Sequence, residues 1–315
     1  MSGRNLSSKV SIIIVNFKNV RDTIECLSTL FSSIEDKKQY YNVIIVDNES
    51  ANGSDFVLHS AFPTATVLSL QRNAGFAGAN NVGILTALKG KPDYIFLLNN
   101  DALVNQQTIE QMLEVFKKDP AIGIVGATIL EYVNPKAIDN MGAEISYLTG
   151  SSKFIANGEL YRRDREDIDV DYSCGAAMMI KREVIENVGL LPEFYFLYGE
   201  EKEFCVLAKN KKYRVVNSAK ATVIHKTSST VRKYRGLKNY YFHRNRFIFL
   251  RLHAKPHQYI FAILHSFLLL FPIYVFRYIL QDKSRPHDRL CELYSFAIGI
   301  IDGIRCKSGY TREVK

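Results

Sequence analysis

The residues with the clearest chemical potential are Asn99, Asn100 and Asp101, which directly follow an apolar run at residues 95–98. Polar side chains at the end of a buried strand need partners once water is removed, so they indicate a ligand site. A carboxylate backed by amides can hold a hard divalent cation, whose other ligands come from substrate phosphates. The alternative is a strand-to-helix turn in which Asp101 caps a helix that begins near Gln106.

Polar groups also follow two other apolar runs. Residues 10–17 (VSIIIVNF) are β-branched and apolar up to Asn16, and residues 41–46 (YNVIIV) are followed by Asp47. Ligands bind at the carboxyl ends of the strands in an open parallel sheet. Three strands that end in this way therefore predict one shared site rather than three unrelated caps.

The elements that must position these groups alternate in type along the chain. Short apolar runs, typical of strands buried on both faces, are separated by stretches with helical spacing of apolar residues. This alternation predicts an α/β fold with a doubly wound, mostly parallel, Rossmann-like sheet. The predicted strands are residues 10–17, 41–46, 67–70, 94–98 and 122–125, and helices are predicted at residues 22–34 and 106–118.

The glycine-rich stretch at residues 72–83 (RNAGFAGANNVG) lets the backbone approach a ligand closely. It does not form the GxGxxG dinucleotide motif, and the chain holds no GxxxxGK[ST] phosphate loop. These absences argue against dinucleotide oxidoreduction and P-loop hydrolysis, whereas the predicted sheet still favours a nucleotide ligand.

The later part of the chain contributes carboxylates and a histidine. After a predicted strand at residues 170–180, Glu200, Glu201 and Glu203 follow an aromatic cluster. They form either the solvated first turn of a helix or partly buried acids, whose raised pKa suits a general base. His225 follows the apolar residues of the last predicted strand, where it is either structural or a ligand.

Composition and charge limit the function classes. The five cysteines are scattered without a CxxC pair, which disfavours zinc and disulfides and predicts a reducing cytosol. Residues 204–281 contain 15 Lys and Arg and no Asp or Glu, whereas residues 1–203 are net acidic. Such a basic segment attracts the phosphates of nucleic acid, nucleotides or lipid head groups, and composition does not choose among them.

The order of these motifs over residues 10–230 resembles that of the inverting family 2 glycosyltransferases of the GT-A fold. The resemblance is to the bacterial rhamnosyltransferase-like branch, which builds surface polysaccharides. It implies a GT-A-type catalytic domain at residues 1–230. The motifs that carry it are VSIIIVNF, IIVDNES, NAGFAGANN, LLNNDALV, SCGAAMMIKRE, FYFLYGEEKEF and the VIH that ends at residue 225.

The resemblance also implies a role for each motif residue. Asp47 would accept a hydrogen bond from a uracil or thymine base, and Gly175 would lie close to a sugar. Asp101 and His225 would bind Mg²⁺ or Mn²⁺ at the diphosphate. Glu201 would be the general base that deprotonates the acceptor hydroxyl, with Glu200 beside it. The full set of implied nucleotide-sugar-binding residues is Asn16, Phe17, Asp47, Asn73, Asn80, Asn100 and Gly175.

The sequence departs from the family pattern at the acidic motifs. The first acid of the metal motif is Asn99 here, and the usual Glu-Asp pair before the helix is Glu200-Glu201. The second Asp is Glu203, and the expected Arg is Leu207. A direct, inverting displacement needs one carboxylate base and a neutralised diphosphate leaving group, and both remain available in the sequence.

The C-terminal segment, residues 231–315, is predicted to be a helical extension. Residues 226–255 are basic with interleaved aromatics but contain no nucleic-acid motif, so no nucleic-acid partner is expected. Residues 259–280 are long enough to span a membrane. Because Pro272, Arg277 and other polar residues interrupt them, we favour a pair of interfacial helices over a span; a core helix is the third alternative. The basic-then-apolar order predicts peripheral contact with the cytoplasmic face of the membrane.

The sequence thus predicts a cytoplasmic, metal-dependent, inverting glycosyltransferase. A dTDP- or UDP-sugar, with rhamnose as one candidate sugar, would be the donor. A hydroxyl of a glycan or of a polyprenyl-diphosphate-linked glycan would be the acceptor. The alternatives are a catalytically weak relative that binds a nucleotide-sugar or glycan beside a partner, a nucleotidyltransferase on a similar sheet, and a nucleic-acid-binding protein.

Overall fold

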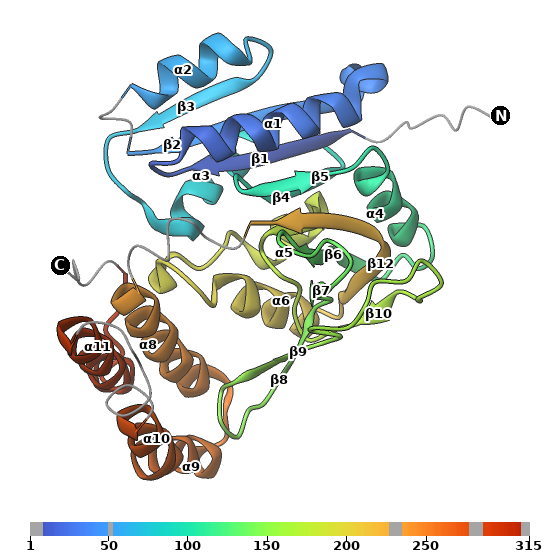
Figure 1. Ribbon diagram of the computed structural model, residues 1–315. Coiled ribbons are helices and arrows are strands. Elements are labelled where there is room, and N and C mark those ends of the chain that lie inside the picture. The colour runs from blue at the N-terminus through green and yellow to red at the C-terminus, as the bar shows by residue number, and fades with distance from the viewer. Residues whose placement is uncertain (1–8, 50–52, 227–234, 277–285, 310–315) are drawn as a thin grey trace. The chain divides into compact units, whose positions relative to one another are not determined.

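A computed structural model describes residues 9–49, 53–226, 235–276 and 286–309 (Figure 1). The chain divides into two compact units. The first unit lies within Met1–Glu144, Phe154–Pro192 and Glu201–Thr227. The second lies within Ile145–Lys153, Glu193–Glu200 and Ser228–Lys315.

The first unit is built on a ten-stranded sheet, which confirms the predicted α/β class. Its strands run in the order β10-β12-β6-β11-β4-β1-β2-β3, with β5 added to β12 and β7 to β6. All pairs between β4, β1, β2 and β3 are parallel, as is β6 with β12, whereas β11 is antiparallel to both of its neighbours. The strands are β1 Val10–Asn16, β2 Tyr41–Asn48, β3 Thr66–Leu70, β4 Tyr94–Asn99, β5 Ala102–Val104, β6 Ile122–Glu131, β7 Ile138–Asn140, β10 Ile168–Asp169, β11 Ala177–Lys181 and β12 Arg214–His225.

Helices cover both faces of this sheet, because its central strands are apolar on both sides. Ile12 and Ile14 of β1 share one core cluster with α1, α2 and α4. Ile13 points to the other face and meets α3 at Gly83, where a Cβ atom would lie 2.5 Å from the isoleucine side chain. The helices of this unit are α1 Val20–Ile34, η1 Glu35–Tyr40, α2 Ser54–Ala61, α3 Gly75–Leu88, α4 Thr108–Phe116, α5 Arg182–Val188 and α6 Glu200–Asn210.

The strand predicted at residues 170–180 is wrong in its first half. The strand β11 begins only at Ala177, after a turn at Gly175. Upstream of that turn the chain crosses β6, where a Cβ atom on Gly126 would lie 1.6 Å from the Ser173 hydroxyl oxygen. The small residues of this stretch therefore allow a close crossing of two chain segments. The strand predicted at residues 122–125 is longer than expected, because β6 pairs along most of the length of β12.

The remaining short elements are two strands and a helical turn. The strands β8 Ala143–Ile145 and β9 Ser152–Phe154 form a separate two-stranded sheet. The helical turn η2 Glu193–Tyr195 precedes α6.

The second unit is helical and is held together by α8 (Arg235–His253) and α11 (Pro286–Ile304). Their backbones pack very closely, because α11 places glycines at the contact. A Cβ atom on Gly299 would lie 2.6 Å from the Tyr240 carbonyl oxygen, and one on Gly303 would lie 2.5 Å from that of Arg244. Larger residues at these positions would force the two helices apart.

The apolar stretch of the C-terminal extension lies at the surface of this unit. The helix α9 (Pro256–His265) continues through a π-helical turn, η3 (Ser266–Leu270), into α10 (Phe271–Phe276). This run is the one described helix that is long and apolar enough to cross a membrane, and most of its side chains are exposed. The third alternative, a helix buried in the core, therefore does not apply to this stretch. The last part of the predicted stretch, residues 277–280, lies outside the described residues.

Two of the basic residues of α8 are buried. Arg244 is 0% exposed and Arg246 is 5% exposed. The guanidinium of Arg246 donates to the carbonyl of Thr149 and to the hydroxyl of Ser266, 3.2 Å away. These two arginines therefore have partners inside the second unit and do not contribute to a basic surface.

His243 of α8 gives a pH-dependent prediction. Burial, with a smaller contribution from the charge of Arg246, lowers the pKa of His243 to about 3. Because the unfolded side chain takes up a proton near pH 6.5 and the folded one does not, the free energy of unfolding falls as the pH drops below that value. Between pH 7 and pH 5, this proton uptake lowers the free energy of unfolding by about 2 kcal/mol. We expect this decrease to be absent in His243→Phe. Urea unfolding of both proteins at the two pH values measures this; equal losses would contradict the prediction.

Candidate functional site

A chain of buried hydrogen bonds joins the carboxyl ends of three strands. The amide of Asn16, at the end of β1, donates to the carboxylate of Asp47, at the end of β2, over 2.8 Å. The Asn16 amide oxygen accepts from the hydroxyl of Thr23 at 2.7 Å, and that hydroxyl accepts from the amide of Asn100 at 2.9 Å. Asn16, Asp47 and Thr23 are each no more than 1% exposed. The structure thus brings three of the predicted residues into one network.

Thr23 is the residue of this network that the sequence reasoning missed. It lies one turn into α1, and its hydroxyl oxygen is also 2.9 Å from the carbonyl of Asn19, which is the acceptor that a threonine in an ordinary helix uses. A single threonine within an amphipathic helix carries no motif, and only the placement of the helix over the strand ends reveals its role.

The glycine-rich loop before α3 is held by the end of β2. Asn48 donates to the side-chain oxygen of Asn73 at 2.9 Å and accepts from the backbone N–H of Ala74 at 2.8 Å. Asn80 lies further along α3, is 2% exposed, and donates to the carbonyl of Phe76 over 2.9 Å. Asn48 directly follows Asp47 in the IIVDNES motif and belongs to the polar cluster at this strand end, but the sequence predicts no role for its side chain.

Phe17 follows the network at the end of β1. Its side chain is partly exposed, and the ammonium of Lys18 lies 5.2 Å from the centre of its ring. A cation in this position is attracted by the ring face. The pair therefore places an aromatic surface and a positive charge immediately beyond Asn16.

Asp101 and His225 lie side by side because β5 pairs with the end of β12, where Ala102 is the register partner of His225. The Nε2 atom of His225 is 3.0 Å from Oδ1 of Asp101 and 3.4 Å from the amide nitrogen of Asn99. The side chain of His225 is 13% exposed and that of Asp101 is 12% exposed, so solvent reaches the pair.

A carboxylate oxygen and an imidazole nitrogen in contact fit two ligands of a divalent cation. Among the described residues, no cluster of three or more His, Cys, Asp or Glu side chains is arranged to hold a metal. A cation bound here would therefore take its remaining ligands from outside these two side chains.

Lys226 ties this strand end to α1. Its ammonium contacts the carboxylates of Asp22 and Glu25, each at 2.6 Å. Burial alone would lower the pKa of Lys226, but these two hydrogen bonds and charges raise it above its ordinary value. The lysine therefore stays charged and holds the end of β12 against the helix that carries Thr23.

Glu201 and Gly175 are neighbours. A Cβ atom on Gly175 would lie 3.6 Å from the Cβ atom of Glu201 and 3.5 Å from the ring of Phe76. Burial raises the pKa of the adjacent Cys174 thiol to about 12, and the charges of Glu201 and Asp101 both add to the shift. Glu201 is partly exposed, whereas Glu200 is buried.

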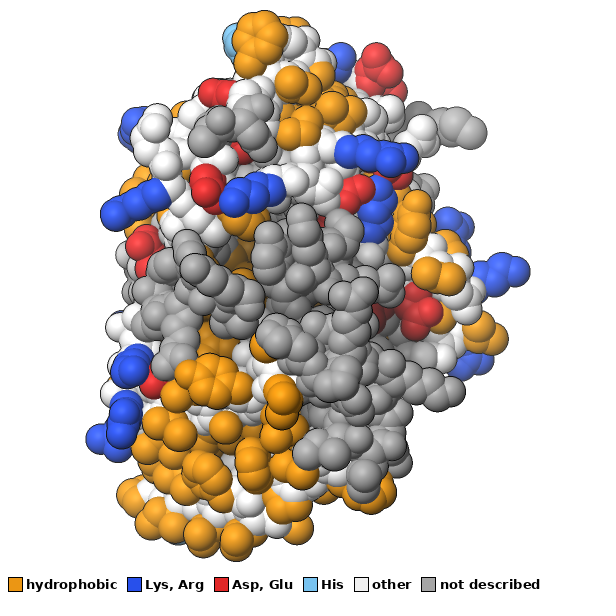
Figure 2. Space-filling view, turned by 60° about the vertical axis from the view of Figure 1, so that its left-hand side comes forward, with side chains coloured by type: hydrophobic (Ala, Val, Ile, Leu, Met, Phe, Trp, Pro, Cys, Tyr) orange, Lys and Arg blue, Asp and Glu red, His pale blue; other side chains and the backbone are white. Residues whose placement is uncertain are grey.

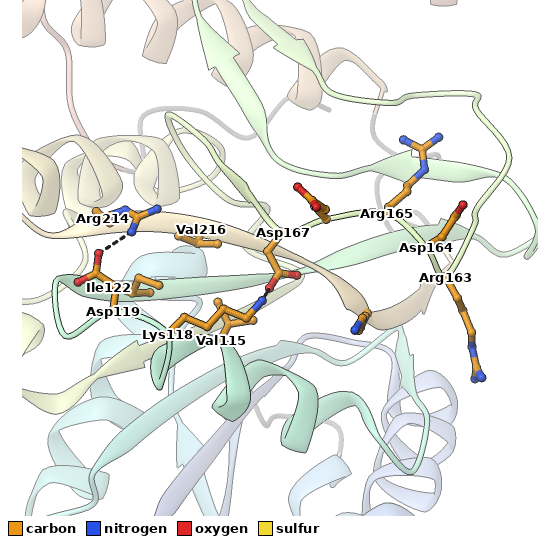
Figure 3. Close-up of a pocket in the computed structure, with 12 residues that line it drawn as sticks. Val115, Lys118, Asp119, Ile122, Arg163, Asp164, Arg165, Asp167, Arg214 and Val216 are labelled. Atoms are coloured by element: carbon orange, nitrogen blue, oxygen red, sulfur yellow. Dashed lines mark hydrogen bonds and ion pairs between the residues drawn. The ribbon is translucent and has the colours of Figure 1, made fainter.

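A separate cavity of about 560 Å³ lies near the first residues of β6 and β12, and none of the predicted site residues lines it (Figure 3). Two ion pairs lie in its lining, Lys118 with Asp167 and Arg214 with Asp119, each at 2.6 Å. The cavity lies at the amino end of β12, whereas His225 lies at the carboxyl end. It therefore does not belong to the site described above.

Comparison with known proteins identifies relatives. The sequence profile of glycosyl transferase family 2 matches residues 11–189. The low-salt glycan biosynthesis hexosyltransferase Agl10 of Haloferax volcanii is 25% identical over 227 residues, which cover 69% of this chain and 66% of Agl10. The dTDP-rhamnosyl transferase RfbF of Shigella flexneri is 22% identical over 289 residues, which cover 84% of this chain and 89% of RfbF. The chain thus spans slightly less than two thirds of Agl10.

Solved structures share the fold. The mannosyltransferase PcManGT from Pyrobaculum calidifontis, in complex with GDP-Man and Mn²⁺, matches with a TM-score of 0.61 at 13% identity, over 94% of this chain and 87% of its own. TarS 1-349 of S. aureus matches with a TM-score of 0.56 at 14% identity, over 93% of this chain and 81% of its own. These likenesses confirm the predicted GT-A-type fold.

The buried network predicts the effect of Thr23→Val. Valine keeps the shape of threonine but leaves the Asn16 amide oxygen and the Asn100 amide without this partner. Because a buried polar group that loses its hydrogen bond is costly, we expect a loss of about 1–3 kcal/mol in unfolding free energy.

The matched control is Thr86→Val, since the Thr86 hydroxyl donates only within α3, to the carbonyl of Val82 at 2.9 Å. We expect this variant to change the unfolding free energy by less than about 1 kcal/mol. Denaturant titration of the two variants measures the difference, and equal values would contradict a role of Thr23 in joining the strand ends.

Proposed function

The chain belongs to glycosyl transferase family 2, and we propose that it is an inverting glycosyltransferase. It would move a sugar from a nucleoside diphosphate donor to a hydroxyl of a glycan or lipid-linked acceptor. The observation that carries this proposal is the common location of Asp47, Asn16 and Asn100 in one network, with the Asp101–His225 pair at the adjoining end of β12. These groups come from distant parts of the chain and lie where open α/β sheets bind ligands.

We propose a dTDP- or UDP-sugar as donor, with rhamnose as one candidate sugar. The similarity to RfbF, a dTDP-rhamnosyl transferase whose match covers most of both chains, supports this choice. PcManGT was solved with GDP-Man, so the fold itself accommodates other bases. In this chain, Asp47 and Asn16 would face the base and Phe17 would line its pocket. Asn73, Asn80, Asn100 and Gly175 would face the rest of the nucleotide-sugar.

Asp101 and His225 would hold Mg²⁺ or Mn²⁺. Their 3.0 Å contact and partial exposure fit such a role, and PcManGT was solved with Mn²⁺. When bound, the cation would neutralise charge on the diphosphate leaving group.

Glu201 would act as general base on the acceptor hydroxyl. Glu201 is partly exposed and lies beside Gly175. Because Gly175 has no side chain, its backbone lies close to Glu201. A direct displacement by an acceptor oxygen that Glu201 deprotonates would invert the anomeric centre. Glu200 is buried, so it would support Glu201 rather than contact the acceptor.

The alternative is a catalytically weak relative that binds a nucleotide-sugar or glycan while a partner performs the chemistry. Glu201 and Leu207 favour it, because each departs from the family pattern. Both proposals require donor binding, and only the first requires turnover.

We further propose that the protein acts at the cytoplasmic face of the membrane. Large apolar side chains gather over α9, η3 and α10, and Figure 2 shows hydrophobic side chains gathered in the lower part of its view. Residues 204–281 contain no acid, which suits an anionic lipid surface. We call these exposed residues the apolar C-terminal surface: Ile260, Phe261, Leu264, Phe267, Leu268, Leu269, Ile273 and Phe276.

Donor binding and turnover are tested together. We expect dTDP- or UDP-sugars with Mn²⁺ to raise the melting temperature, since a ligand at a hundred times its Kd stabilises the folded state by about 2.7 kcal/mol. Glu201→Gln should keep this shift but lose at least ~10²-fold in transfer or donor hydrolysis. Asp101→Asn should lose the dependence of the shift on Mn²⁺.

The matched control is Glu183→Gln, an exposed acid at the start of α5. It should change neither the shift nor the rate. Binding without turnover in the unmodified protein would instead support the catalytically weak relative, and the absence of any nucleotide-dependent shift would contradict both proposals.

Membrane contact is tested with Leu264→Glu/Leu268→Glu in the full chain. Burial of each leucine in lipid is worth roughly 1.5–3 kcal/mol, so we expect at least ~10²-fold weaker binding to phosphatidylglycerol vesicles. Phe56→Glu is the matched control, because Phe56 of α2 is an exposed apolar residue outside this surface. Co-sedimentation measures the binding. Equal binding of all three proteins, or none by the unmodified protein, would overturn the proposal.

A further inference from the structure

Lys18 and Glu49 occupy matching places beyond the ends of two neighbouring strands. Asn16 of β1 and Asp47 of β2 are partners in the parallel register. Lys18 follows the first of these partners by two residues, and Glu49 follows the second by two. The Lys18 ammonium lies 3.2 Å from the Glu49 carboxylate. The ion pair therefore joins the two chain segments where they leave the sheet, within the first unit.

Both residues have a backbone conformation that suits glycine. The φ angle of Lys18 is 52° and that of Glu49 is 89°. A side chain strains the backbone in this region, and such strain is found mainly at sites that bind or react. Glycine would remove the strain at either position. The presence of a lysine and a glutamate therefore indicates a use for their side chains.

The ion pair also lies against an aromatic ring. The Lys18 ammonium lies over the ring of Phe17, 5.2 Å from its centre. Phe17 and Glu49 are partly exposed and Lys18 is exposed, so solvent reaches all three side chains. Because the ammonium occupies one face of the ring, a planar base can stack only on the opposite face.

We propose that Lys18 and Glu49 are positioning residues for the nucleotide. Glu49 holds the Lys18 ammonium over one face of the Phe17 ring, and the uracil or thymine base of the donor stacks on the other face. This inference rests on the proposed function, which places the base of a nucleoside diphosphate beside Phe17. The pair acts through the place of the ring, and neither charge has to contact the diphosphate.

A fluorescent reporter measures this stacking. The chain contains no tryptophan, so Phe17→Trp introduces a single one at the position of the ring. We expect titration of this reporter protein with UDP or dTDP, in the presence of Mn²⁺, to change the tryptophan emission, because the base would stack on the indole. All further variants are made in this background and compared with it.

Three variants separate positioning from charge. If the pair positions the ring, Lys18→Met, Glu49→Gln and the double variant should each weaken nucleotide binding roughly 3–10-fold, by similar factors. If charge alone mattered, Glu49→Gln would strengthen the binding of an anionic nucleotide, and the double variant would bind as the reporter protein does. Lys18→Arg should restore binding, because a guanidinium also pairs with carboxylates and lies over aromatic rings.

Two further variants serve as controls. Lys117→Met removes a similarly exposed ion pair at the end of α4, where Lys117 lies 2.9 Å from Glu114, and it should leave nucleotide binding unchanged. Lys18→Gly removes the side chain together with the backbone strain. It should weaken binding as Lys18→Met does without lowering the midpoint of urea unfolding, which would exclude lost stability as the cause.

The outcomes distinguish the positioning role from the proposed function. Unchanged binding in Lys18→Met, or stronger binding in Glu49→Gln, would overturn the positioning role and leave donor binding in place. A nucleotide-dependent rise in the melting temperature of the unmodified protein, without a change in emission from residue 17, would also overturn it. If neither the melting temperature nor the emission responds to nucleotide, the proposed function is contradicted and the positioning role with it.

Discussion

The hydroxyl of Thr23 is the contact on which the candidate site most depends. It donates to the amide of Asn16 and accepts from that of Asn100, so one helix residue joins the ends of β1 and β4. The amide of Asn16 in turn donates a hydrogen bond to Asp47, so the orientation of Asp47 also depends on Thr23. Parallel pairing places the strand ends at one edge, but it does not orient their side chains. The hydroxyl supplies the orientation, in a place with almost no solvent to replace it.

A second constraint acts at the other end of the site. The short strand β5 follows Asp101 directly and pairs with the end of β12, which brings His225 beside Asp101. The backbone N–H of Lys226 then donates to the Asp101 carbonyl at 3.0 Å, while its ammonium contacts Asp22 and Glu25 of α1. The same helix therefore holds both halves of the site, through Thr23 on one side and through these acids on the other.

Much of the fold and the gathering of polar strand ends could be predicted from the sequence, because both depend on local patterns. Apolar runs with polar ends predict buried strands and their ligand edge. Thr23 and Asn48 could not be predicted in the same way, since their roles depend on which elements the fold places side by side. The strand predicted at residues 170–180 was wrong for a related reason: its small residues allow a chain crossing, which no periodicity shows.

The C-terminal extension illustrates why charge alone does not assign function. The sequence predicts that its basic residues attract phosphates, yet Arg244 and Arg246 are buried and bind carbonyl or hydroxyl oxygens of their own unit. Guanidinium groups are favoured in such places, because several donors in a fixed fork can satisfy several backbone acceptors at once. The helical unit thus combines two kinds of surface. Buried side chains of α8 bind backbone and hydroxyl oxygens of the unit, whereas α9 to α10 expose the apolar C-terminal surface. The buried hydrogen bonds require a fixed geometry and the exposed apolar side chains do not, so substitutions in the two places should affect different properties of the protein.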